Sequence, residues 1–572
     1  MKLKPLPDLR KHIPIAVWLP KYQHNLFRAD LISGITVWGV AVPAAMAYAE
    51  LAGLPPQAGL YAAFAGMLAY ALFASSHHLK VTASSTMAVM SAAIVVELTA
   101  GAGPEKYAAL SAMLALTVGG IILLAGVVKL GFISDFLSKP VITGFLFGVS
   151  LEVIVSQAPK LFGLPRGIGN IFAQISQLGL GLPKTNPWTL GIGVGSLLLI
   201  FVMKRYARRI PGGLVALFAG IIVTTLFNLE QRDVSVVGSI PTGLPLPVIP
   251  AVNPSDLPLL IASAGGIVFL AVGESVGAAR AFAAKHHYEI DSDQELIALG
   301  AANLSAGLFQ GFTVDASLSS TATGEEAGAQ TQLSSIISAI LIIVTVAVLA
   351  PLFTELPNAV LGAIIIYSCL GLLDFGALKR FYREHRTDFW LSVVALVGVI
   401  VTDVLSGLLI AVFLSVVMVV YSASRPHLTE LGEIPSHPGD YGGIERHPEN
   451  QRVQGMLIVR LDAPLFFANA NVARTQILKL VIETGTPPKA LLFDMSASNI
   501  LDITSIDMMS SLINDLEATQ VKVLLCSVLG PVRDKLRISG LMDRIGENHV
   551  YPSVDKAVQD FLRRHSAKEN TP

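Results

Sequence analysis

The chain is poor in charged residues and in cysteine. Only 14% of its 572 residues are Asp, Glu, Lys or Arg, whereas 53% are hydrophobic, and soluble domains usually carry roughly 25% charged residues. The two cysteines, Cys369 and Cys526, provide no disulfide framework. The formal net charge of −1 says little about partners because the charges are segregated along the chain, and we expect no nucleic-acid partner. This composition excludes an ordinary soluble protein and predicts a polytopic α-helical membrane protein.

The N-terminal residues lack the apolar core and small-residue cleavage site of a secretory signal. They are basic and interrupted by prolines, so we expect residues 1–28 to form a retained cytoplasmic segment. Apolar stretches then follow one another almost without interruption from Leu31 to Tyr421. This pattern predicts a transmembrane domain over 29–423.

The apolar stretches predict about fourteen membrane spans. Basic residues follow even-numbered spans, such as Lys204 and Arg205 after the sixth and Lys379 and Arg380 after the twelfth. The positive-inside rule then places both termini in the cytoplasm, and we expect a bacterial inner membrane. The predicted spans are 31–49, 57–73, 84–98, 108–129, 133–155, 187–203, 212–228, 257–281, 294–310, 317–329, 331–351, 357–373, 388–404 and 405–422.

The third and tenth spans are short and begin with polar residues. They occupy corresponding positions when the chain is divided into two halves of seven spans, which is the pattern of an inverted-repeat transporter with a site at the bilayer midplane. The N-termini of half-helices offer free N–H groups and positive dipole ends to an anion. The alternative is that these hydroxyls only hydrogen-bond within packed helices. The candidate substrate-binding residues at the two N-termini are Ser84, Ser85, Thr86, Ser317, Leu318 and Ser319.

Glu274 is an acid well inside an apolar stretch. A charged carboxylate there costs roughly 2.5–3.5 kcal/mol on insertion scales, so such residues usually face a pathway or a partner. Gly277 and Ala278 share its helix face and leave room beside it. We predict an ion or proton site at Glu274; the alternative is a structural pairing with another helix. Glu152 and Asp403 also lie in apolar surroundings, where we expect structural roles.

The composition changes after Tyr421. A polar linker is expected over 424–451, a soluble α/β domain over 452–566 and a short tail over 567–572. Alternating strand and helix patterns predict a small sheet covered by helices. The domain has no metal-ligand spacing, nucleophile elbow or phosphate loop, so we expect no enzyme activity and no cofactor. The predicted strands are Met456–Leu461, Ala490–Phe493 and Val521–Cys526.

The stretch Val42–Tyr61 (VPAAMAYAELAGLPPQAGLY) resembles the signature of the SulP family of sulfate permeases, known in animals as solute carrier family 26. Further similarity covers 274–280, 293–311 and 327–332. The C-terminal domain resembles a STAS domain, with Asp494 and Asp502 at the positions of its two recurring aspartates. The resemblance implies seven plus seven inverted repeats forming core and gate domains, an elevator-like movement, a homodimer, and secondary transport of anions.

The resemblance also bears on the substrate. Ala44 and Tyr48 lie in the first span where the family places substrate-binding residues, and Ala44 replaces a common glutamine. The arginine of the tenth half-helix is replaced by Ser320, and Asp315 adds a negative charge nearby. A divalent anion would therefore meet less compensation than in a typical member. Sulfate is the family default, and bicarbonate, chloride, nitrate and dicarboxylates are the other candidates.

Glu274 occupies the acidic position that the family associates with proton or sodium coupling. Ala278 lacks the hydroxyl of sodium-coupled members, which favours H⁺ over Na⁺. Two other functions stay open: an uncoupled anion channel or exchanger, and a membrane-anchored sensor that signals through its STAS domain. The serine of the STAS phospho-switch is Ile503 here, so we expect a scaffolding or dimer-stabilising role with an unknown partner.

Overall fold

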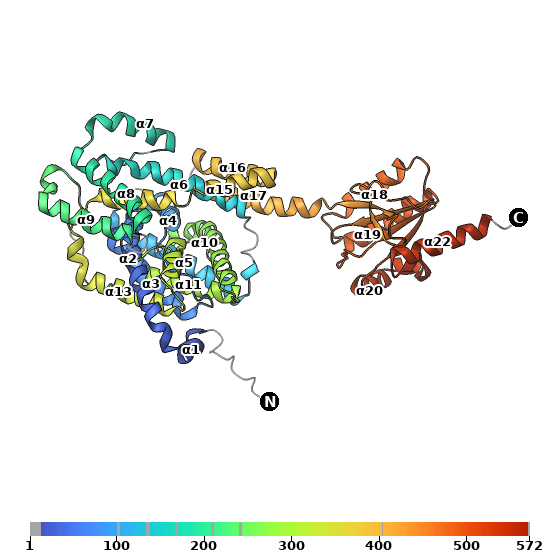
Figure 1. The fold of residues 1–572 in the computed structure, drawn as a ribbon, viewed down its shortest axis with the longest axis horizontal. Helices are drawn as coiled ribbons and strands as arrows, with labels where there is room; N and C mark the ends of the chain where they lie inside the picture. Colours follow the sequence, from blue (N-terminus) through green and yellow to red (C-terminus); the bar gives the residue numbers. More distant parts are fainter. Residues whose placement is uncertain are drawn as a thin grey trace. The chain divides into compact units, whose positions relative to one another are not determined.

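The computed structural model describes residues 13–99, 103–132, 138–167, 169–207, 211–238, 243–402 and 404–569. The chain divides into two compact units, one up to Ser415 and one from Val416 onward. Figure 1 draws the helical unit in blue to yellow and the sheet-containing unit in orange to red. Asp403, expected to be structural, and residues 1–12 of the expected cytoplasmic segment lie outside the described residues.

The first unit is helical apart from two short strands, β1 (Val81–Thr82) and β2 (Asp315–Ala316). Each of the fourteen predicted spans falls on a helix. By length and composition, seven helical stretches among the described residues can cross a membrane. The helices are α1 (Ile15–Trp18), α2 (Phe27–Leu51), α3 (Pro56–Phe73), α4 (Ser85–Thr99), α5 (Pro104–Val127), α6 (Lys139–Leu161), α7 (Ile171–Gly181), α8 (Pro187–Tyr206), α9 (Gly212–Phe227), α10 (Leu257–Lys285), α11 (Ser292–Leu308), α12 (Leu318–Glu326), α13 (Leu333–Val344), α14 (Asn358–Leu370), α15 (Phe375–Glu384), α16 (Arg386–Val401) and α17 (Val404–Ser424).

The helix contacts repeat between the two halves of this unit. Helix α3 packs on α13 as α11 packs on α5, and α2 packs on α13 as α10 packs on α5. Helix α8 likewise packs on α14 as α16 packs on α6. Exchanging α2–α6 with α10–α14 and α8 with α16 leaves these contacts unchanged. Six helices of each half therefore follow one contact pattern, as the two predicted repeats require.

The contacts also separate two groups of helices. Helices α2–α5 and α10–α13 contact one another and form the core group. Helices α6, α8, α9, α14 and α16 form the gate group. The larger contacts between the groups come from α2 and α4, which touch α6, α9 and α14. The site described below belongs to the core group.

Glycines allow the closest approaches between helices. A Cβ at Gly59 of α3 would lie 1.8 Å from the Ala45 carbonyl oxygen of α2, and one at Gly144 of α6 would lie 1.9 Å from the Ser392 carbonyl oxygen of α16. Such small residues are typical of packed membrane helices because backbones can then meet directly.

The second unit is a six-stranded sheet with the strand order β4-β3-β5-β6-β7-β8. Strands β5 to β8 are parallel, and β3 is antiparallel to both its neighbours. Side chains of β5 alternate between two apolar layers, with Leu457 and Val459 on one face and Met456 and Ile458 on the other. The elements are β3 (Leu428–Glu433), β4 (Tyr441–Gly443), β5 (Met456–Leu461), β6 (Ala490–Asp494), β7 (Lys522–Cys526), β8 (Val550–Tyr551), α18 (Ala470–Glu483), α19 (Ile503–Ala518), α20 (Gly530–Ile538), α21 (Leu541–Ile545) and α22 (Val554–Glu569).

The segment 424–451 is not simply the linker expected from its polar sequence, because it contains β3 and β4. Leu431 of β3 is 3% exposed and belongs to the second apolar layer. Both strands contain glycine and lack the apolar alternation that marks a strand in sequence, and β4 is only three residues long. The soluble unit therefore begins before residue 452.

Candidate functional site

The two broken segments meet. Strands β1 and β2 pair antiparallel, with Val81 opposite Ala316 and Thr82 opposite Asp315. The Ser317 amide also donates to the Lys80 carbonyl oxygen at 2.9 Å. Each strand leads directly into a half-helix, β1 into α4 and β2 into α12. The expected meeting of the two half-helices is therefore present.

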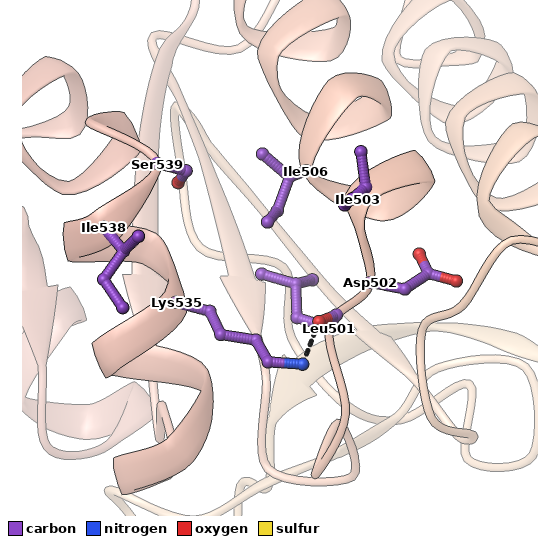
Figure 2. Close-up of a pocket in the computed structure, with 7 residues that line it drawn as sticks. All are labelled: Leu501, Asp502, Ile503, Ile506, Lys535, Ile538 and Ser539. Carbon is purple, nitrogen blue, oxygen red and sulfur yellow. Dashed lines mark hydrogen bonds between the residues drawn. The ribbon is translucent and has the colours of Figure 1, made fainter.

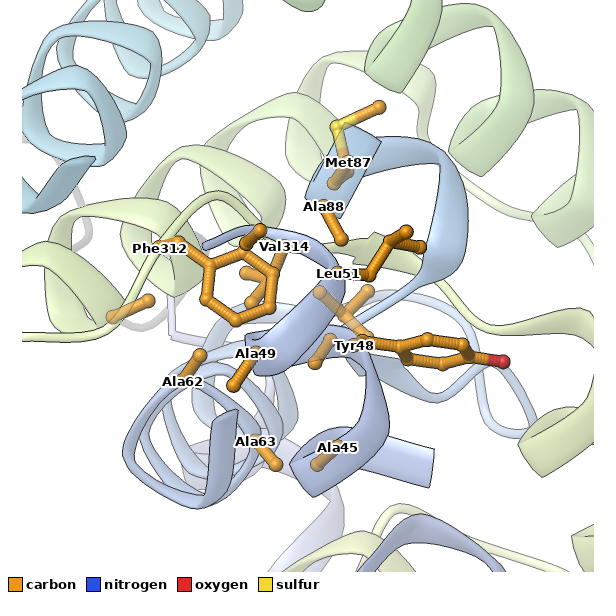
Figure 3. Close-up of a cluster of buried hydrophobic side chains, with 14 of the residues drawn as sticks. Ala45, Tyr48, Ala49, Leu51, Ala62, Ala63, Met87, Ala88, Phe312 and Val314 are labelled. Atoms are coloured by element: carbon orange, nitrogen blue, oxygen red, sulfur yellow. The ribbon is translucent and has the colours of Figure 1, made fainter. Parts of the chain in front are cut away.

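Buried apolar side chains hold these segments against α2 and α3 (Figure 3). Ala88 of α4 and Val314 before β2 belong to the same buried cluster as alanines of α2 and α3. Tyr48 lies at the edge of this cluster with its hydroxyl directed away from it. The hydroxyl is beside Ser85 and Ser368. Ala44 lies one turn earlier on α2 and is half-buried.

The N-termini of both half-helices are capped by serine. Ser84 Oγ accepts from the Met87 amide at 3.2 Å, and Ser317 Oγ accepts from the Ser320 amide at 3.3 Å. The Ser317 hydroxyl also lies 3.3 Å from that of Ser319. Two of the predicted hydroxyls therefore serve their own helices, as the packing alternative expected. Ser319 and Leu318 are exposed, whereas Ser85 and Thr86 are buried.

Buried oxygen atoms without donors surround the strand pair. Within the described part of the chain, Thr82 Oγ1, Glu274 Oε2 and both carboxylate oxygens of Asp315 have no hydrogen-bond partner. The Glu274 and Asp315 carboxyl groups are close enough to interact electrostatically. Ser275 ties α10 to β2, because its Oγ accepts from the Ala316 amide at 3.0 Å. Buried acceptors of this kind need a hydrogen-bond donor, a proton or a cation.

There is open space on the Glu274 face of α10. A Cβ at Gly277 would meet no atom within 4 Å, and Gly277 itself is exposed. Ala278 is 8% exposed and adds no polar group. The geometry therefore leaves room beside the carboxylate.

Sequence reasoning missed two features of this region. Asp315 was interpreted only as a charge near the anion, whereas the structure brings it to Glu274. Thr82 was not singled out, although it pairs with Asp315. The one available signal was the alternation of apolar and polar residues along β1, which places the Thr82 side chain on the opposite face from that of Val81. Glu152 lies on α6 in the gate group, outside the four helices that carry the site residues.

The soluble unit has its own features. Asp502 caps α19, accepting from the Ser505 amide at 2.8 Å and the Phe467 amide at 2.7 Å. Slight burial raises the pKa of Asp502, but these hydrogen bonds outweigh it and leave the pKa below its usual value. A pocket of about 410 Å³ lies beside it (Figure 2). Its lining residues are Leu501, Asp502, Ile503, Ile506, Lys535, Ile538 and Ser539.

No group of three His, Cys, Asp or Glu side chains suited to a metal ion occurs among the residues that the structure describes. Broken helices that meet through a strand pair, within two related halves, are the features of a transport protein of the inverted-repeat class.

The profile of the Sulfate permease family matches residues 27–395, and that of the STAS domain matches residues 447–557. The chain is 35% identical to Probable sulfate transporter MT1781 of Mycobacterium tuberculosis, over 96% of this chain and 98% of that protein. It is 31% identical to Sulfate transporter 3.1 of Arabidopsis thaliana, over 96% of this chain and 87% of that protein.

Among solved structures, murine Slc26a9, described as an anion transporter in the inward-facing state, aligns with a TM-score of 0.87 and 24% identity, covering 98% of this chain and 95% of that one. The transmembrane domain of the cyanobacterial bicarbonate transporter BicA aligns with a TM-score of 0.61 and 24% identity, covering 68% and 98%. These two likenesses show the fold. The chain belongs to the sulfate permease family and ends in a STAS domain. It is an integral membrane anion transporter and not an enzyme.

Proposed function

We propose that this protein carries sulfate or a related inorganic anion across the membrane, coupled to protons through Glu274. The pairing of β1 with β2 carries the proposal, because it brings the N-termini of α4 and α12 together. First-turn N–H groups of both helices could then bind one anion, to which Tyr48 and Ser319 would add hydroxyls. The names of the relatives favour sulfate over bicarbonate.

Proton coupling is supported by the unpartnered oxygens of Glu274 and Asp315. A proton needs one carboxylate, whereas Na⁺ requires several oxygen ligands, and Ala278 lacks the hydroxyl that would add one. Two neighbouring carboxyl groups in a site of low polarity favour sharing a proton, because two negative charges there repel strongly. The coupled movement of a proton and an anion reduces the net charge that crosses the bilayer.

We further propose an elevator-like movement of the core group against the gate group. The contacts between the groups are limited, and one of them is an ion pair between Glu50 of α2 and Lys160 of α6, at 2.6 Å. An ion pair across such a boundary can break and reform as the groups move. Both termini are proposed to be cytoplasmic in a bacterial inner membrane, with the protein a homodimer and its STAS partner unidentified.

Uptake into proteoliposomes tests the coupling. Anion uptake by the wild-type protein should rise severalfold when an inward proton gradient is imposed. Glu274→Gln should lose this dependence, because a neutral amide cannot bind and release the proton. Glu152→Gln, which removes a carboxyl group from a gate helix, is the matched control and should keep it.

Unchanged coupling in Glu274→Gln would show that the proton site is elsewhere. Anion currents that ignore pH and reverse at the anion equilibrium potential would instead identify an uncoupled channel on the same fold.

A further inference from the structure

Lys80 is a lysine with 0% exposure, located immediately before β1. Its Nζ donates to Ser334 Oγ at 2.6 Å. Within the described part of the chain, no carboxylate lies within ion-pair distance of this ammonium group. Burial of a charge without a direct counter-charge is unfavourable, and a bound anion is one way to offset it.

The backbone of Lys80 is joined to the first turn of α12. Its carbonyl oxygen accepts from the Ser317 amide at 2.9 Å, and its amide donates to Thr321 Oγ1 at 3.0 Å. The side chain then follows α12, because a Cβ at Gly324 would lie 3.3 Å from Lys80 Cε. Gly324 is seven residues beyond Ser317, which is about 10 Å along a helix. The ammonium group therefore lies about 10 Å behind the half-helix N-terminus, in the protein interior.

The acidic group whose field reaches Lys80 is Asp30. Its carboxylate already accepts from the Tyr22 hydroxyl at 3.0 Å, from the Gln330 amide at 2.8 Å, and from the Thr331 amide at 3.1 Å and hydroxyl at 2.7 Å. Asp30 thus attracts Lys80 electrostatically without a direct ion pair. Its hydrogen bonds also hold the residues that precede α13. At the proposed anion site the acids are Glu274 and Asp315, which repel an anion. A positive charge nearby would offset this repulsion.

We propose that Lys80, in its protonated form, is the positive charge behind the proposed anion site and sets the preference of that site for a doubly charged oxyanion. This inference rests on the proposed function. Two unit charges about 10 Å apart at an effective dielectric constant of about 20 change an affinity by about ten- to twentyfold. This factor in affinity applies once for each charge of the anion. The affinity for a divalent anion therefore increases by about the square of the factor for a monovalent anion.

Helix α12 contains no basic residue (LSSTATGEE), so the charge does not come from the half-helix itself. Ser320 is 2% exposed and shares the face of Gly324, against which the Lys80 side chain packs. A cation placed at residue 320 would therefore project into the space that Lys80 fills. This gives a charge swap as a test.

The experiment compares Lys80→Met with the wild type in proteoliposome uptake of sulfate and of nitrate. Methionine keeps an unbranched side chain of similar length without the charge. We expect the KM for sulfate to rise about a hundredfold and that for nitrate about tenfold. Lys80→Arg should keep the wild-type ratio. Lys106→Met, which removes a half-exposed lysine paired with Asp256 at 3.5 Å on the surface of the same unit, is the matched control and should change neither.

The charge swap Lys80→Ala with Ser320→Arg should recover much of the sulfate preference, which a purely structural role for Lys80 would not allow. Equal effects of Lys80→Met on both anions, or a wild type that prefers nitrate to sulfate, would overturn the inference. If Lys80→Met does not fold, as judged by size exclusion, the charge-swap variant decides. If the wild type transported no anion at all, the proposed function itself would fail.

Discussion

The two halves of the membrane unit have related backbones but differ in the charged side chains near the strand pair. In each half a two-residue strand leads into a half-helix capped by serine. The first half brings Lys80 and the neutral Thr82 to the strand pair, whereas the second brings Glu274 and Asp315. The related backbones therefore bring the two half-helices together, whereas the side chains differ: the first half contributes a basic residue and the second contributes two acids.

The largest expected effect comes from blocking the pocket in the second half. Ser319→Leu places a bulky side chain at the exposed first turn of α12 and should abolish uptake without unfolding the protein. Glu326→Leu, at the exposed last turn of the same helix, should leave uptake within about twofold. Radioactive anion uptake together with a melting curve measures both. Full activity of Ser319→Leu would place the anion elsewhere.

A second test exchanges polar groups at the paired positions of the two strands. Asp315→Asn removes an ionisable group with no hydrogen-bond partner among the described residues, so we expect the severalfold stimulation of uptake by an inward proton gradient to be largely lost. Thr82→Val removes only a hydroxyl and should change uptake less than threefold. Uptake at two external pH values gives both numbers. Equal effects would show that the two sides of the pocket do not differ in the way the charges indicate.

A smaller effect is expected at the boundary between the core and gate groups. Glu50→Gln removes the ion pair with Lys160, and partly exposed pairs contribute about 0.2–1 kcal/mol. We expect a two- to fivefold change in the maximum rate with little change in KM, because the pair acts on the movement and not on the pocket. The double variant Glu50→Lys with Lys160→Glu should return the rate toward the wild-type value. A change in KM alone would contradict this role.

The smallest effect is expected outside both halves. Asp502→Ala removes the cap of α19 and should destabilise the STAS domain by about 1 kcal/mol while leaving anion KM unchanged. Since the folded pKa of Asp502 is below its unfolded value, its contribution is present above about pH 4 and is lost as the pH falls through the folded pKa. Calorimetry of the full chain at pH 7 and at low pH measures the loss. A wild-type-like melting temperature at pH 7 would contradict the cap.

Much of the fold could be predicted from the sequence because span length and apolar content are local properties. The half-helices were visible because their polar entries, such as Ser84–Thr86, interrupt an apolar pattern. Helices α7 and α15 were not predicted, since they are short and α15 is rich in charged residues. The pairing of Glu274 with Asp315 could not be read from the sequence, because it depends on how β2 lies against α10.

The position of Lys80 also depends on contacts between segments far apart in the chain, so the sequence did not predict it. In sequence it is one basic residue beside two histidines, and basic residues near span ends usually lie in water. Only the pairing of β1 with β2 shows that its side chain runs inward along α12. Strands β3 and β4 were overlooked for a different reason, because both contain glycine and lack the apolar alternation that marks a strand in sequence.

The four-residue ladder of β1 and β2 has a consequence for how this protein can change over evolutionary time. The ladder joins the two repeats at one point. A substitution that moves one half-helix would therefore also move the other. New cargo preferences are then most easily acquired by exchanging individual side chains around a conserved main-chain frame.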